Sequence, residues 1–368
     1  MNALLLLAQE TAESLAVESS RLKAQTLWLF GVVLGVLGIA YAVGRVMRRR
    51  PEGSINVAVL RTFNLRIRAW WMMCAILMFG FILRWPSATV FLFFLVSFWA
   101  LREFVTMTPT RRGDHRALFW VFFVFTPVQY LLVAIGRSFV TMDGDWTAWA
   151  GRSLGLTGVD FYGLYSIMIP VYASLFIPAR IAISGDHKRF LERSAKIQAG
   201  LLICVYSLSY APALLHLELV DYQNHIWTGK VGDNESVLFF FVLTVQLGDV
   251  FQYGWGKLLG RRVIAPAINA SRTWEGFFGG IATTTLVGAL LWWATPFRIW
   301  EAACMSMVIA VMGFAGSMTM SAIKRDRGVE DYGTLVQGHP GVLDRIDSIC
   351  FAAPVFYHLT RYFFSTSV

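Results

Sequence analysis

Long apolar segments alternate with short charged segments along the whole chain. An apolar run of about 17–25 residues is long enough to cross the hydrocarbon core of a membrane as a helix. The pattern therefore predicts an all-α, polytopic integral membrane protein with about ten transmembrane helices. The predicted spans are roughly 26–44, 70–85, 87–104, 117–136, 161–179, 197–216, 235–255, 277–295, 299–319 and 348–364.

The amino-acid composition also indicates a membrane protein. Charged residues make up 15% of the chain and hydrophobic residues 56%, whereas about 25% of the residues of a soluble domain are charged. The N-terminal sequence MNALLLLAQE has a short apolar run and no basic region, so we expect no signal peptide. All four cysteines lie within apolar segments without CxxC spacing, so we expect from them neither a disulfide nor a metal centre.

The net charge of +9 is spread along the chain rather than gathered in one patch. The basic residues stand at the ends of apolar segments, as orientation signals do, which argues against a nucleic-acid-binding protein. With the N-terminus outside, 24 of the 32 lysines and arginines fall in cytoplasmic loops. These predicted cytoplasmic loops are 45–69, 102–116, 180–196, 257–275 and 321–347.

The segment 246–280 contains a first group of candidate site residues. Asp249 lies inside an apolar span. Placing a carboxylate at the centre of a membrane helix costs about 2.5–3.5 kcal/mol of insertion free energy, so we expect Asp249 to face a polar cavity or a partner. Ser271 and Arg272, just before the next apolar segment, are candidates to bind a phosphate, and an ordinary helix cap is the alternative interpretation. The segment predicts a polar site at the cytoplasmic face.

A second group lies in 321–347, where both signs of charge stand between two apolar segments. Orientation signals account for the basic residues, but acidic residues do little for orientation. Asp331 precedes Asp344 and Asp347, which share one face of a helix because they are three residues apart. His339, in the turn GHPG, is either a site residue or a structural one. Carboxylates hold hard cations and basic side chains bind phosphate oxygens, so we expect a polyphosphate with its Mg²⁺ beside Lys324, Arg325 and Arg345.

Together these residues resemble the signature of the phosphatidate cytidylyltransferases, also called CDP-diacylglycerol synthases. That signature reads approximately S-x-x-K-R-x4-K-D, a short spacer and H-G-G-x-x-D-R-x-D, with an upstream S-P-x-K-[ST]-W-E-G. The downstream part matches at Ser321, Lys324, Arg325, Asp331, His339, Gly341, Asp344, Arg345 and Asp347. The upstream region is similar at Asp249, Tyr253, Gly256, Lys257 and 271–276.

The resemblance is strong over about 235–365 and weaker over 60–235. It implies an N-terminal lead with an extra transmembrane helix over 1–60, and a cytidylyltransferase-like membrane domain over 61–368. The sequence is closest in character to a paralogous bacterial branch of the family. We therefore expect a multi-pass protein of the bacterial inner membrane with its active site on the cytoplasmic face.

The implied reaction transfers a cytidylyl group from CTP to phosphatidate, giving CDP-diacylglycerol and pyrophosphate in phospholipid biosynthesis. The expected partners are CTP, phosphatidate and membrane lipid, with a homodimer as a candidate assembly. The implied ligands of Mg²⁺ are Asp331, Asp344 and Asp347, and clustered carboxylates can hold a second cation. The implied phosphate-binding residues are Ser271, Arg272, Lys324, Arg325 and Arg345. Asp249 and His339 complete the implied catalytic site.

Two positions depart from the family signature. Glu330 stands where the signature has a lysine, and Pro340 where it has the first glycine of H-G-G, which removes an N–H. If this segment is helical, Arg327 faces Glu330 from three residues earlier. The alternatives are a related nucleotidyltransferase acting on another lipid phosphate and a catalytically silent paralogue that binds or transports lipid. A transporter should contain inverted repeats, and we find no internal repeat.

Overall fold

The computed structural model describes residues 31, 35, 86–107, 110–135, 161–220, 227, 234–329 and 341–365. The chain divides into two compact units, 1–89 and 90–368. The elements described below belong to the second unit, apart from the first residues of α3. The predicted span 70–85 and, apart from Gly31 and Gly35, the predicted span 26–44 lie outside the described residues.

Seven helices make up the first part of the second unit among the described residues. They are α3 (Pro86–Met107), α4 (His115–Trp120), α5 (Thr126–Ile135), α8 (Phe161–Ile167), α9 (Ser174–Ala182), α10 (Phe190–Leu201) and α11 (Leu208–Ala213). Short π-helical turns join α4 to α5, α8 to α9 and α10 to α11, at Val121–Phe125, Met168–Ala173 and Leu202–Ser207. Single 3₁₀ turns lie at Arg112–Asp114, Leu214–His216 and Trp292–Ala294. The π turns keep each pair as one continuous helical segment.

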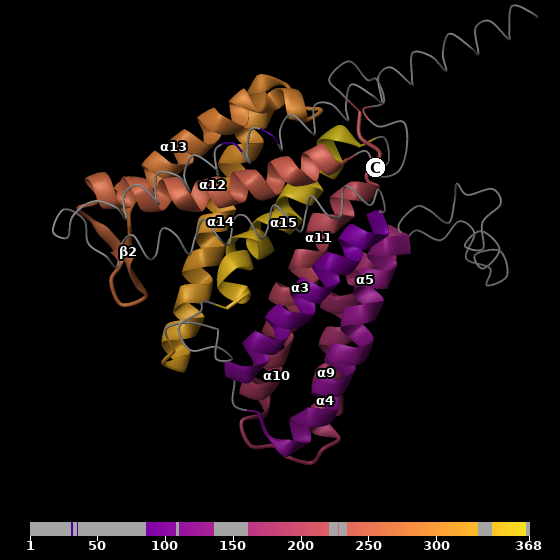
Figure 1. Cartoon of the computed structure of the whole chain (residues 1–368). Coiled ribbons are helices and arrows are strands. Elements are labelled where there is room, and N and C mark those ends of the chain that lie inside the picture. The colour runs from indigo at the N-terminus through magenta and orange to yellow at the C-terminus, as the bar shows by residue number, and fades with distance from the viewer. Residues whose placement is uncertain are drawn as a thin grey trace, which may run out of the picture. The chain divides into compact units, whose positions relative to one another are not determined.

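The C-terminal part holds the elements that carry the candidate site. They are α12 (Glu235–Leu259), β1 (Val263–Ala265), β2 (Asn269–Thr273), α13 (Trp274–Leu290), α14 (Ile299–Arg327) and α15 (Leu343–Phe364). Figure 1 shows α13 alongside α12, and α15 between α14 and α11. β1 and β2 form an antiparallel hairpin. The all-α prediction missed this hairpin, because it is short and lies in a loop rather than in an apolar segment.

Six helical segments of the described residues are long and apolar enough to cross a membrane, judged by length and composition. They are Ser87–Met107, His115–Ile135, Tyr162–Ala182, Phe190–His216, Glu235–Leu259 and Ile299–Arg327. Each coincides with a predicted span. The predicted spans 277–295 and 348–364 are also helical, but α13 has 17 residues and α15 contains four charged residues. The prediction of a helical membrane protein is confirmed, and the count of ten spans is not.

A close approach between α12 and α13 sets the geometry at the site. A Cβ atom added to Gly276 would lie 2.6 Å from the Gln252 carbonyl oxygen and 2.9 Å from the Gly256 Cα. Small residues at a helix contact let the two backbones come together in this way. Because the backbones are so close, the residues just before α13 lie directly against α12.

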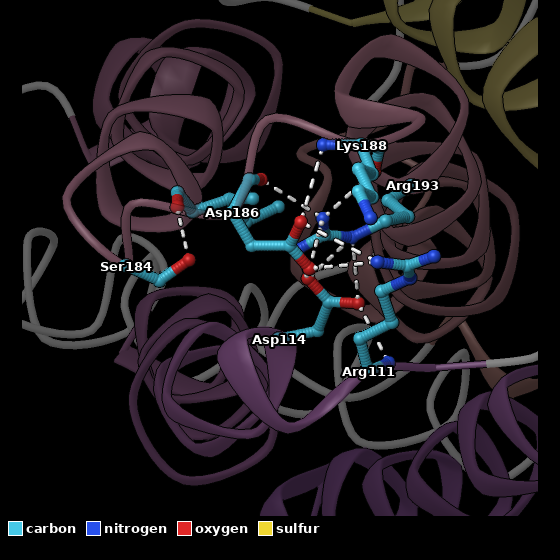
Figure 2. A network of polar contacts seen from close by, with 7 residues as sticks. Arg111, Asp114, Ser184, Asp186, Lys188 and Arg193 are labelled. Carbon is cyan, nitrogen blue, oxygen red and sulfur yellow. Dashed lines mark hydrogen bonds and ion pairs between the residues drawn. The ribbon is translucent and has the colours of Figure 1, made fainter.

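A network of polar contacts with one buried ion pair joins the loops at the ends of α3 and α9, as Figure 2 shows. The Arg193 Nε donates to Asp114 Oδ1 at 2.9 Å, and these two side chains are 5% and 1% exposed. Asp186 lies 3.0 Å from the Arg193 Nη1 and 3.2 Å from the Arg111 Nη1. Partial desolvation opposes ionisation of Asp186, but the Lys188 N–H and the two guanidinium groups outweigh it and hold the pKa of its carboxyl below its usual range.

Candidate functional site

An arginine from β2 reaches the carboxylate that lies within an apolar span. The Arg272 Nη2 is 3.0 Å from Asp249 Oδ1, and their side chains are 15% and 26% exposed. The same guanidinium donates to Gln252 Oε1 at 3.0 Å and to the Ser317 hydroxyl at 2.6 Å. Arg272 therefore links β2 to α12 and α14. Of the two expected surroundings of Asp249, a polar cavity or a partner, the structure shows a partner.

The hairpin explains how Arg272 comes to this place. After α12 ends, the chain turns at Ile268, whose N–H donates to the Ala265 carbonyl at 3.0 Å. β2 then leads directly into α13, where the Thr273 hydroxyl accepts the Gly276 N–H at 3.1 Å as the N-cap. A Thr or Ser hydroxyl at the N-cap stabilises the first turn of a helix by accepting a backbone N–H. Thr273 therefore caps α13, and its neighbour Arg272 makes the ion pair with Asp249.

A second carboxylate approaches Asp249 from the start of α15. The Ser348 hydroxyl lies 2.6 Å from Asp249 Oδ2 and 3.2 Å from Asp347 Oδ1, and the Ser348 N–H donates to Asp347 Oδ1 at 2.7 Å. The Gln246 side-chain amide also donates to the Arg345 carbonyl at 3.2 Å, which ties α12 to the same turn of α15. Asp249 and Asp347 therefore lie on either side of one hydroxyl group.

The predicted residues Lys324 and Asp344 pair with each other. The Lys324 Nζ is 2.7 Å from Asp344 Oδ1, across the contact of α14 with α15, and both side chains are largely buried. One turn of α14 earlier, the Ser321 hydroxyl accepts from the Asn269 amide at 3.2 Å. The exposed Arg325 donates from Nε to the Ile268 carbonyl at 3.2 Å. The hairpin turn and the end of α14 are therefore held together.

Other predicted residues are not joined to this network or fall outside the described structure. Ser271 is exposed, and its hydroxyl donates to Asn269 Oδ1 at 2.7 Å rather than reaching Asp249. Asp331 and His339 lie outside the described residues, as do the departures Glu330 and Pro340. Among the residues that the structure describes, no three His, Cys, Asp or Glu side chains form a group able to hold a metal ion. The predicted ligand set cannot be assembled there because it includes Asp331.

The sequence interpretation missed three residues that the network uses. Gln252 is three residues after Asp249, so the spacing alone places both on one face of α12. Ser317 lies on α14 and Ser348 directly follows Asp347. Serines in apolar helices are common and carry no signal by themselves, so these two could not have been selected without the contacts of Arg272 and Asp249.

The arrangement combines carboxylates with cationic side chains from four elements, α12, β2, α14 and α15. Arg272, Lys324 and Arg325 can neutralise phosphate oxygens. Asp249 and Asp347 offer the oxygen atoms that hard cations prefer. The site therefore brings both signs of charge close together.

Comparison with known proteins identifies the family. Residues 64–363 match the model of the cytidylyltransferase family. The uncharacterised protein YnbB of Escherichia coli is 34% identical over 306 residues, which cover 81% of this chain and 87% of YnbB. A phosphatidate cytidylyltransferase of Staphylococcus haemolyticus is 24% identical over 79% of this chain and 97% of its own length. One of Synechocystis is 34% identical over 40% of this chain and 51% of its own length. The chain belongs to the cytidylyltransferase family.

Proposed function

We propose that the protein transfers a cytidylyl group from CTP to phosphatidate and releases pyrophosphate, at the cytoplasmic face of a bacterial inner membrane. The observation that carries the proposal is the network in which Arg272 joins Asp249 to α14, beside Asp347 and the Lys324–Asp344 pair. Two relatives that match this chain bear the name phosphatidate cytidylyltransferase. Asp249, Arg272, Lys324, Asp344 and Asp347, which belong to this network, are also among the residues that resemble the family signature.

The reaction needs charge stabilisation more than covalent chemistry from the protein. An oxygen of the phosphatidate phosphate attacks the α-phosphorus of CTP, and the bond from that phosphorus to the pyrophosphate oxygen breaks. Negative charge is spread over phosphate oxygens during this transfer. Lys324, Arg325 and Arg345 would bind those oxygens, and Arg272, held by Asp249, would present a fixed positive charge. No side chain has to act as a nucleophile.

A magnesium ion is the expected cofactor of this reaction. Asp331, Asp344 and Asp347 would hold it, and the carboxylate and hydroxyl oxygens that meet at Ser348 are the donor type that Mg²⁺ prefers. When bound, Mg²⁺ would neutralise charge on the phosphates. Asp344 is paired with Lys324 in the structure, so the same lysine could contact either this carboxylate or a bound phosphate.

A related nucleotidyltransferase acting on another lipid phosphate is the second candidate. It is favoured by two sequence departures, Glu330 and Pro340, in the segment that resembles the nucleotide-binding part of the signature. A charge reversal and a lost N–H both change how phosphates would be bound. The reaction class and the metal would remain the same.

The direct test is to incubate purified protein with labelled CTP, phosphatidate and Mg²⁺ and to measure the labelled lipid product. We expect CDP-diacylglycerol from the wild type and about 100-fold slower formation with Arg272→Ala, since removing one transition-state donor costs this much in other enzymes. Cys304→Ser, an exposed change on α14, is the matched control. Absence of any liponucleotide with phosphatidate would contradict the proposal, and product formed only with another lipid phosphate would support the second candidate.

A further inference from the structure

A buried glutamate on α3 contacts the beginning of α15. The Glu103 carboxylate accepts the Val342 N–H at 3.1 Å through Oε1 and the Leu343 N–H at 2.9 Å through Oε2. The Trp99 indole N–H donates to Oε1 at 3.2 Å. Glu103 is 6% exposed, so both of its oxygens are committed to these N–H groups inside the protein.

The contact supplies what the first turn of α15 needs. The first N–H groups of a helix have no partner within the helix and must find one elsewhere. Val342 precedes α15 and its own side chain makes no capping hydrogen bond. A carboxylate in this place also interacts favourably with the positive end of the helix dipole. Glu103, from a helix far away in the sequence, therefore acts as the cap of α15.

The capped turn carries carboxylates of the candidate site. Asp344 follows Leu343 directly and pairs with Lys324 at 2.7 Å. Asp347 lies one turn further and meets Asp249 at Ser348. Because a helix is rigid over one turn, fixing the N–H groups of Val342 and Leu343 fixes the position of both aspartates.

We propose that Glu103 is a positioning residue of the site: its carboxylate holds the start of α15 so that Asp344 and Asp347 meet the phosphates and the cation in one geometry. The reaction that it serves rests on the proposed function. Burying a carboxylate is costly unless it is fully hydrogen bonded. An apolar residue would pack α3 without that cost, but it could not accept the two N–H groups.

The test uses Glu103→Gln, which preserves size but replaces one accepting oxygen with an NH₂ group. Gln129→Ala is the control, because Gln129 is also buried and donates to the Tyr165 carbonyl and the Ser209 hydroxyl within the helices α5, α8 and α11. Hydrogen exchange over 341–349, thermal unfolding and the Mg²⁺ dependence of turnover are measured for both variants and the wild type.

For Glu103→Gln we expect at least tenfold faster amide exchange at Val342 and Leu343, at least tenfold lower kcat, and a several-fold higher Mg²⁺ concentration for half-maximal activity. Glu103→Asp, which keeps the charge, should recover part of the activity. The control should lower the unfolding temperature without changing the Mg²⁺ dependence, because it leaves the cap of α15 intact.

Two results would overturn the proposal. One is unchanged exchange at Val342 and Leu343 in Glu103→Gln, which would show that the cap does not hold this turn. The other is faster exchange with unaltered kcat and Mg²⁺ dependence, which would show that the turn is not needed for the site. If the wild type makes no liponucleotide, the proposed function fails separately. Amide exchange over 344–349 in Glu103→Gln then tests the positioning role. If the cap holds the turn that carries the aspartates, its loss should also speed up exchange over 344–349.

Discussion

At the scale of single residues, the contact between Arg272 and Asp249 shows how a charge is accommodated within an apolar helix. Both side chains are partly buried, and the guanidinium also donates hydrogen bonds to the Gln252 and Ser317 side chains. Removing one member of a buried pair leaves an uncompensated charge, which costs more than the pair contributes. Because each charge needs the other, the Arg272–Asp249 pair keeps this part of the helix packing polar.

Asp344→Asn tests the metal role of the carboxylate on α15. The amide keeps the shape and can still accept from Lys324, but it loses the charge that holds a hard cation. We expect turnover to fall by about 100-fold or more while the protein still folds, measured as kcat over a range of Mg²⁺ concentrations. Asp326→Asn is the control, since this exposed carboxylate pairs with its neighbour Arg327. Near-normal turnover of Asp344→Asn at ordinary Mg²⁺ would remove Asp344 from the site.

Glu330→Lys tests the charge reversal in the signature. The helical geometry that would place Arg327 opposite Glu330 is not present, because α14 ends at Arg327 and Gly328 has a left-handed φ of 69°. Glu330 itself lies outside the described residues, so its pairing with Arg327 stays a prediction. Among the described residues, Arg327 pairs with Asp326. If position 330 lines the phosphate site, Glu330→Lys should lower KM for CTP, and the effect should weaken at high salt because it is electrostatic. A KM that is unchanged at all salt concentrations would place residue 330 outside the nucleotide site.

At the scale of elements, a buried ion pair connects two loops that lie far apart in the sequence. Asp114 accepts from the Arg193 side chain and from the Arg111 N–H at 2.9 Å. These contacts tie the loop before α4 to the start of α10. The polar ends of the helices are thus fixed by hydrogen-bonded ion pairs inside the protein.

Asp114→Ala should be strongly destabilising because it leaves the buried Arg193 guanidinium without its partner. Breaking such a pair costs about 3–5 kcal/mol, and we expect a clearly lower unfolding temperature in detergent. Asp186→Asn is the comparison, since its side chain is 29% exposed and pairs at the surface contribute about 0–1 kcal/mol. Equal stability of the two variants would show that burial of the Asp114–Arg193 pair does not matter.

At the scale of the whole molecule, contacts connect four of the predicted cytoplasmic loops. Asp114 and Arg193 join 102–116 to 180–196. Glu103 and Val342 join 102–116 to 321–347. The latter contacts 257–275 through the hydrogen bond from Arg325 to Ile268. Four loops that contact one another in this way are expected on one side of a membrane.

Labelling of single cysteines tests the topology. In a cysteine-free background, a cysteine that replaces Lys188 or a residue within 330–340 should react with an impermeant reagent only after lysis. The segment 137–160 lies between the predicted spans 117–136 and 161–179, on the side opposite the predicted cytoplasmic loops, so a cysteine there should react on intact cells. The reason is the bias of basic residues toward the cytoplasm. Reaction within 330–340 on intact cells would exclude both the predicted orientation and a cytoplasmic site.

The sequence alone determined the helical membrane architecture, and it predicted the region of the candidate site. Apolar length is a local property, so six predicted spans appear as helices at the expected positions. A carboxylate in an apolar span needs a partner wherever it lies, so Asp249 was recognisable as a candidate site residue. The aspartates of 321–347 were recognisable as candidate site residues because orientation signals consist of basic residues and do not require aspartates.

The choice of partners depended on the tertiary structure. Three contacts join elements that are far apart in the sequence but adjacent in space. Arg272 pairs with Asp249, Ser348 lies between Asp249 and Asp347, and Glu103 caps α15. Hydrophobic periodicity places a residue on a face of its own helix but does not specify which helix will cover that face. Only the packing of α3, α12, β2, α14 and α15 brings these donors and acceptors within hydrogen-bonding distance, which is about 2.7–3.2 Å between an N–H nitrogen and its acceptor oxygen.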